Sequence, residues 1–223
     1  MASHQQLGKL ILLSALDSPN VAIALQQHMR FSTSAPNVGY LASGHEAQRQ
    51  YFSATQQVYA SFGAQMDTYC ELTQDYSEQA FSDLLNCDMI HLAGGDTFGF
   101  LQGVIQRQVS EQLVQYYLQG GSFIGLSAGA MLLTDTIATA PLCGDNNAVG
   151  LKDLSGLGLY PNLYVPHVTD PQALVPKLQQ FADDHVDQLH SDTIVLASDN
   201  DVIVYSHGQQ QVYGQPLFWS LND

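Results

Sequence analysis

Ser127 is the residue best placed to do chemistry, because it stands at the centre of Gly125-Leu126-Ser127-Ala128-Gly129, directly after an apolar run. This stretch matches the G-x-S-x-G pattern that puts a nucleophilic serine on a sharp turn between a strand and a helix. Small flanking residues permit strained backbone angles, and amides that open a helix favour negative charge. The stretch predicts a nucleophile beside an anion site; the simpler interpretation is that two glycines permit close packing of helix on strand.

A second candidate anion site lies in the stretch HLAGGDTFGF at 91–100. Gly94 and Gly95 follow an apolar run and precede a predicted helix that Asp96 or Thr97 would cap. Backbone amides at such a turn can hold the oxyanion that forms when a serine attacks a carbonyl group. We expect these glycines to lie near Ser127 and to supply a second oxyanion donor, the alternative being an ordinary glycine turn before a helix.

His167 is the best placed of the eight histidines to act as a base, because it lies near the end of the strand-like run LYVPHV at 163–168. A neutral imidazole, with a usual pKa of about 6.5, accepts a serine proton at physiological pH. His91 lies inside a predicted strand and His207 in a late turn. The other five are expected to be solvent-exposed at the N-terminus or on helices: His4, His28, His45, His185 and His190.

A third group must hold the imidazole in the correct tautomer. The segment 139–162 is rich in Gly, Asn and Asp, which predicts a long ordered loop, and its candidates are Asp145, Asn146, Asn147 and Asp153. We favour Asp145, with Asn146 as its alternative. Cys143 precedes them as a second conceivable nucleophile, although a small side chain filling the loop is the simpler interpretation.

The composition limits the classes of partner. Among 223 residues, 45% are hydrophobic, and 21 acidic residues against 6 basic ones give a formal net charge of -15. Such a surface repels phosphate backbones and anionic lipids, so we expect no nucleic-acid or membrane binding. Three widely spaced cysteines do not suit a disulfide framework and predict a reducing compartment, the cytoplasm. The early apolar run is too short for a spanning helix, and it lacks the cleavage site of a signal peptide.

Apolar strand-like runs alternate with segments of helical period along most of the chain. Strands are expected at 9–15, 37–43, 65–72, 88–94, 122–127, 163–168, 193–198, 201–206 and 210–214. Helices are expected at 18–29, 45–63 and 77–87, between the glycine turn and 121, and within 170–189. This order predicts one α/β domain over 1–223, a three-layer α/β/α sandwich with a mostly parallel central sheet. In such sheets the carboxyl ends of the strands carry the ligand site, and the three candidate stretches lie there.

With these residues identified, the chain resembles the serine peptidase family that includes peptidase E (aspartyl dipeptidase) and cyanophycinase. The resemblance rests on IHLAGGDTF, GLSAGA, GLKDLSGLGL and VPHV, and on Asp199 and Asp201 before the strand VIVYS. It implies a class I glutamine amidotransferase-like, or flavodoxin-like, fold. It further implies that Ser127 is the nucleophile, His167 the base, and Gly95 and Ala128 the oxyanion amides. One departure is Asp96, which stands where the family frequently has Asn.

The predicted reaction is hydrolysis of a short peptide or related amide through an acyl-enzyme, without a metal or organic cofactor. The resemblance suggests cleavage after an N-terminal aspartate, whose carboxylate would need a cation. Six basic residues are available, and Arg107 is the nearest in sequence to the glycine turn: Lys9, Arg30, Arg49, Arg107, Lys152 and Lys177. We expect a monomer or a homodimer.

Three enzyme alternatives fit less well. An esterase of the α/β-hydrolase fold would share the serine turn, but its oxyanion loop follows an earlier strand. A glutamine amidotransferase would need cysteine at position 127, and the metallopeptidase motif H-E-x-x-H fails at Arg49. A non-catalytic binding or regulatory module on the same scaffold, with an unused serine, is the alternative outside the enzymes.

Overall fold

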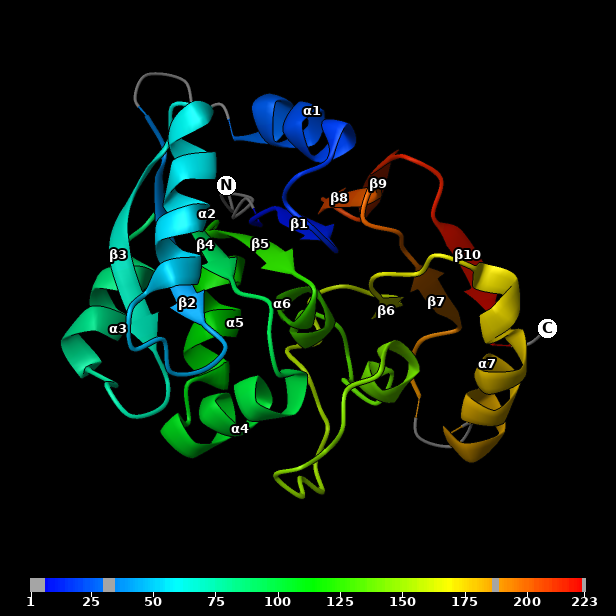
Figure 1. Ribbon diagram of the computed structural model, residues 1–223. Helices are drawn as coiled ribbons and strands as arrows, with labels where there is room; N and C mark the ends of the chain where they lie inside the picture. Colours follow the sequence, from blue (N-terminus) through cyan, green and yellow to red (C-terminus); the bar gives the residue numbers. More distant parts are fainter. Residues whose placement is uncertain (1–6, 30–34, 186–188, 222–223) are drawn as a thin grey trace, which may run out of the picture.

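A seven-stranded sheet forms the centre of the computed structural model, which describes residues 7–29, 35–185 and 189–221 (Figure 1). Its strands are, in spatial order, β3 (Gln65–Glu71), β2 (Asn37–Ala42), β4 (Met89–Leu92), β5 (Ser122–Leu126), β1 (Leu10–Leu13), β8 (Val202–Ser206) and β9 (Gln209–Tyr213). The pairs from β3 to β1 are parallel, and the pairs of β8 with β1 and with β9 are antiparallel. The predictions for His4 and Arg30 fall outside the described residues.

Helices cover both faces of this sheet, because its buried strands are apolar on both sides. In β1, Leu10 and Leu12 pack into one apolar cluster, whereas Ile11 and Leu13 pack into the other. The Ile11 side is covered by α1 (Pro19–His28) and α2 (Gln50–Ser61). The Leu10 side is covered by α3 (Glu78–Leu85), α4 (Thr97–Arg107), α5 (Ser110–Leu118) and α6 (Ala128–Leu132). The predicted α/β fold with a mostly parallel sheet is confirmed.

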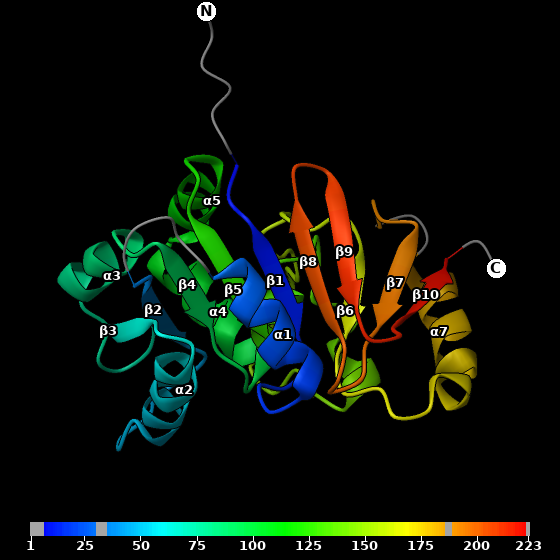
Figure 2. The same cartoon turned by 90° about the horizontal axis from the view of Figure 1, so that it is seen from above.

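A second, three-stranded sheet lies beyond the β8–β9 end of the first (Figure 2). It contains β10 (Leu217–Ser220), β7 (Thr193–Leu196) and β6 (Leu163–Val165), with β6 and β7 parallel. Helix α7 (Pro171–His185) packs on it through Leu178 and Phe181. The sequence pattern predicts β6 and β7 but neither β10 nor their separation into a sheet of their own.

The loop before α2 differs from the prediction of a helix over 45–63. Helix α2 begins at Gln50, after Arg49 takes a left-handed conformation with φ of 48°. The Glu46 carboxylate accepts hydrogen bonds from the amides of Tyr51 and Phe52, so Glu46 caps the helix from outside it. His45 therefore lies in a loop rather than on a helix.

The segment 139–162 is irregular, as predicted, except for a short 3-10 helix η1 (Ala140–Cys143). Within the three described ranges, the helices are too short or too polar for any of them to cross a lipid bilayer.

Candidate active site

Ser127 stands on a strained turn between β5 and α6. Its φ of 50° and ψ of -106° are unusual for a residue with a side chain, and its amide donates to the carbonyl of Leu13 at 2.8 Å. Neither flanking glycine can carry a Cβ. At Gly129 the added atom would lie 2.2 Å from the carbonyl oxygen of Leu92, and at Gly125 it would lie 2.7 Å from the Cα of Ala130. The glycines thus allow the close packing that holds the serine turn in place, so the two interpretations of this stretch are compatible.

The imidazole of His167 meets this serine. His167 follows β6, has a positive φ of 60°, and places Nε2 2.9 Å from Oγ of Ser127. Its backbone amide donates to Oγ of Ser14 at 3.3 Å, which ties the turn to the end of β1. The ring is 47% exposed, so a substrate can reach it. This geometry suits proton transfer between hydroxyl and imidazole.

The carboxylate that contacts His167 is Asp199, whose Oδ1 lies 2.6 Å from Nδ1. The prediction that Asp145 holds this imidazole is wrong. Asp145 instead accepts hydrogen bonds from the amide and the hydroxyl of Thr97, because its loop packs against the start of α4.

None of the other three loop candidates, all of which the structure describes, hydrogen-bonds to His167. Asn147 exchanges hydrogen bonds with the backbone of Leu151, Asp153 accepts from the amide of Ser155, and the carbonyl of Asn146 accepts from the amide of Ala148. A sequence signal for Asp199 exists, because Asp199 follows an apolar strand just as His167 does.

The two predicted oxyanion donors flank the serine. A Cβ built on Gly94 would lie 3.5 Å from that of Ser127, so the glycine turn and the serine turn are neighbours. Gly95 has a φ of 133°, which a residue with a side chain rarely adopts. The carbonyl of Gly94 accepts from the Ser43 hydroxyl at 2.6 Å, which fixes this turn. Ala128 is the first residue of α6, where a backbone N–H has no acceptor within the helix.

A cavity of about 600 Å³ opens beside the serine. Ser127, His167, Gly94 and Gly95 line one part of it, and its other walls come from residues 14–16 after β1, from β2, from the loop before α2 and from α2 itself. The polar residues on those walls include His45, Glu46, Tyr40 and Tyr51. Among the described residues that line this cavity there is no lysine or arginine.

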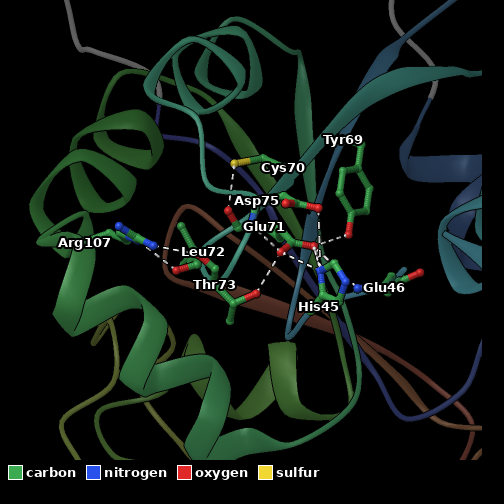
Figure 3. A network of polar contacts seen from close by, with 9 residues as sticks. All are labelled: His45, Glu46, Tyr69, Cys70, Glu71, Leu72, Thr73, Asp75 and Arg107. Atoms are coloured by element: carbon green, nitrogen blue, oxygen red, sulfur yellow. Dashed lines mark hydrogen bonds and ion pairs between the residues drawn. The ribbon is translucent and has the colours of Figure 1, made fainter. Parts of the chain in front are cut away.

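His45 is fixed in the cavity wall by Glu71, as Figure 3 shows. Its Nδ1 lies 3.1 Å from Oε1 of Glu71, and its side chain is 31% exposed whereas that of Glu71 is 1% exposed. Glu71 also accepts hydrogen bonds from the hydroxyls of Tyr69 and Thr73 and from the amide of Asp75. No local sequence pattern indicates this contact, because residues 45–63 have helical period.

Glu71 remains a carboxylate over the whole physiological range. Burial alone would raise its pKa, but the hydrogen bonds from Asp75, His45, Thr73 and Tyr69 outweigh burial and lower the pKa to about 2. His45, Glu71 and Asp75 place three oxygen and nitrogen atoms within 4.8 Å of one another, a spacing that could hold a cation. The hydrogen-bond donors that surround Glu71 stabilise its negative charge.

Arg107, the candidate cation for a substrate carboxylate, does not line the cavity beside Ser127. Its guanidinium donates to the carbonyls of Leu72 and Thr73 and lies 4.5 Å over the ring of Tyr76, on the far side of the Glu71 network from His45 (Figure 3). Its role is therefore to fix the chain after β3.

Two other reactive side chains are accounted for by their packing. Burial, followed by the charge of Asp145, raises the pKa of the Cys143 thiol to about 11, and the thiol contacts the carbonyl of Ala140. It therefore stays protonated, as a loop-filling residue would. Burial lowers the pKa of His91 to about 3, and its Nδ1 pairs with the hydroxyl of Tyr59.

One family model matches most of the chain, and a sequence search finds a related peptidase. The sequence profile of peptidase family S51 matches residues 10–213. An uncharacterized peptidase of Pasteurella multocida (strain Pm70) is 31% identical over 131 residues, which cover 58% of this chain and 62% of that relative.

Two crystal structures share the fold. A peptidase E candidate from Listeria monocytogenes EGD-e superposes with a TM-score of 0.73 at 19% identity, over 94% of this chain and 99% of that one. A peptidase from an acI-B1 actinobacterium superposes with a TM-score of 0.64 at 17% identity, over 97% of this chain and 95% of that one.

Proposed function

Because the chain belongs to peptidase family S51, a family of serine-type peptidases, we propose that it hydrolyses short peptides with Ser127 as the nucleophile. His167 is the general base in this proposal, and Asp199 orients it. The observation that carries the proposal is the continuous contact from Ser127 Oγ through the imidazole to Asp199, with distances of 2.9 Å and 2.6 Å. This is the order of groups that activates a serine hydroxyl.

The reaction begins when Oγ of Ser127 attacks the peptide carbonyl carbon and its proton passes to Nε2 of His167. Asp199 stabilises the imidazolium through Nδ1. The amides of Gly95 and Ala128 hold the oxyanion, a contribution worth about 3 kcal/mol for one such donor in other serine enzymes. The C–N bond then breaks, His167 gives its proton to the leaving amine, and a water molecule releases the acyl group by the same steps.

The acyl part of the substrate occupies the cavity beside Ser127. Its size of about 600 Å³ suits a small ligand, and residues of both the glycine turn and the serine turn line it. We further propose that the peptide bond cleaved is the one after an N-terminal aspartate. No lysine or arginine is found among the described residues lining the cavity, so we propose that a substrate carboxylate there contacts the imidazole of His45, which Glu71 holds in the wall.

The proposal is tested with a library of dipeptides that includes aspartyl members. The wild-type protein is expected to release free amino acids from a subset of them. Ser127→Ala should keep the fold, checked by circular dichroism, and lose the activity. Wild-type turnover retained in Ser127→Ala, or no cleavage of any dipeptide or longer peptide by the wild type, would remove the proposal.

A further inference from the structure

His167 lines two cavities, and only one of them contains Ser127. The cavity described above lies on the Ser127 side of the imidazole. A second cavity of about 410 Å³ is also lined by His167, together with the rest of 165–170, residues 141–144 and the first turns of α7. His167, whose side chain is exposed, therefore lines both hollows.

The proposed reaction places the acyl part of the substrate in one of these cavities and the leaving amine part in the other. In the tetrahedral intermediate the oxygen points to the glycine turn, and the leaving nitrogen must face Nε2 of His167 to receive its proton. The acyl group stays on Ser127. The leaving fragment therefore departs past His167, and the cavity that contacts His167 but not Ser127 is where that fragment fits.

Lys177 gives the second cavity a positive charge. It projects from α7 into the lining of this cavity, and no carboxylate forms an ion pair with it in the parts of the chain that the structure describes. Asp170, which lines the same cavity, accepts from the amides of Gln172 and Ala173 at the start of α7. In a chain of net charge -15, a cation beside the site is the feature able to attract a carboxylate.

A third, mostly apolar cavity adjoins the second one at Lys177. The third cavity, of about 580 Å³, shares Pro141, Leu142 and Lys177 with the second. Its walls are mostly apolar and include Phe98 and Phe181. Its acidic residue, Asp184, accepts hydrogen bonds from the Gln180 amide at 3.0 Å. This hollow suits an apolar side chain carried by a fragment whose carboxylate is held at Lys177.

We propose that the cavity formed by His167, residues 141–144 and Lys177 binds the leaving fragment of the substrate, with the fragment's free α-carboxylate on Lys177 and an apolar side chain in the hollow lined by Phe98 and Phe181. Lys177 is then a specificity-determining residue. It selects peptides that end in a free carboxylate shortly after the cleaved bond. This assignment rests on the proposed function, since the direction of departure follows from the role of His167.

The test compares two probes, aspartyl-leucine and aspartyl-leucinamide, which differ only in the charge of the C-terminus. The variants are Lys177→Met and, as a matched control, Lys152→Met, because Lys152 is also exposed but lines none of the three cavities. The wild type should favour the free acid in kcat/KM. Lys177→Met should lower kcat/KM for the acid by about tenfold, mainly through KM, and leave the amide unchanged.

The preference for the acid should shrink in 1 M NaCl, because salt screens an exposed ion pair. Equal kcat/KM values for acid and amide in the wild type, or an equal effect of Lys177→Met on both probes, would overturn the assignment while leaving Ser127 as the nucleophile. Should the wild type cleave neither probe, the best X-Leu dipeptide of the library and its amide replace them. Absence of any Ser127-dependent cleavage contradicts the proposed function itself.

Discussion

Asp199 and His167 are in contact although 32 residues separate them along the chain. They meet because β6 and β7 are parallel neighbours, with Val165 paired to Leu196, so the segments that leave the two strands emerge side by side. The pairing continues past the strands, where the amide of Val168 donates to the carbonyl of Ala197. The small second sheet thus presents a histidine and its carboxylate to a serine on the large one.

The first prediction separates the two candidate carboxylates. Asp199→Asn should lower kcat by about 1,000-fold or more, because an amide cannot stabilise the imidazolium and favours the wrong tautomer. Asp145→Asn is the matched control, since Asp145 contacts Thr97 instead. It should keep kcat within a few-fold of the wild type. The measurement is steady-state hydrolysis of the best library dipeptide, and the reverse ranking of the two variants would restore Asp145.

The second prediction concerns the glycine behind the serine. Gly129→Ala should lower the free energy of unfolding by about 3 kcal/mol, because the new methyl group collides with the backbone carbonyl of Leu92, which cannot move aside without disturbing β4. Gly44→Ala is the control, because a Cβ at Gly44 meets nothing within 4 Å. Urea unfolding measures both. Equal stability of the two variants would show that the serine turn tolerates a side chain at position 129.

The third prediction concerns Glu71. Glu71→Gln should lower the free energy of unfolding at pH 7 by about 2 kcal/mol, since it removes a buried charge to which five groups hydrogen-bond. Because the folded pKa of about 2 lies below the usual 4.5, the carboxylate's contribution is full above about pH 4.5 and is lost as the pH falls toward 2.

Urea unfolding at pH 7 and pH 3.5 checks the prediction for Glu71. The difference in free energy of unfolding between the wild type and Glu71→Gln should be smaller at pH 3.5 than at pH 7. Glu78 is exposed, so Glu78→Gln should have the same free energy of unfolding as the wild type at both pH values. A gap that widens in acid would mean that Glu71 is protonated in the folded state.

Much of the fold was predictable because local patterns are strong where strands are buried. The apolar runs that became β1, β4 and β5 are covered on both faces, so they carry no polar alternation to obscure them. The strand β10 was missed because Leu217 and Phe218 are each 38% exposed in a short edge strand next to Gly214 and Pro216. The separation of β6 and β7 from the main sheet depends on long-range pairing, which no local pattern encodes.

In the site, too, some residues have a local sequence signal, whereas other contacts depend on tertiary packing. Ser127 and Gly95 carry local signals, because a strained turn and a positive φ both require small residues nearby. The contact of Asp145 with Thr97, and that of Asp199 with His167, depend on which segments pack together. His45 was assigned to a helix because residues 45–63 have helical period, whereas capping by Glu46 delays the start of α2 to Gln50.

Labelling with a serine-directed fluorophosphonate, followed by peptide mapping, tests the central claim that His167 activates Ser127. The wild type should carry a single adduct on Ser127. Ser127→Ala should carry none, and His167→Ala should react at least about 100-fold more slowly. An adduct on another residue, or labelling of Ser127 at an unchanged rate in His167→Ala, would contradict the account.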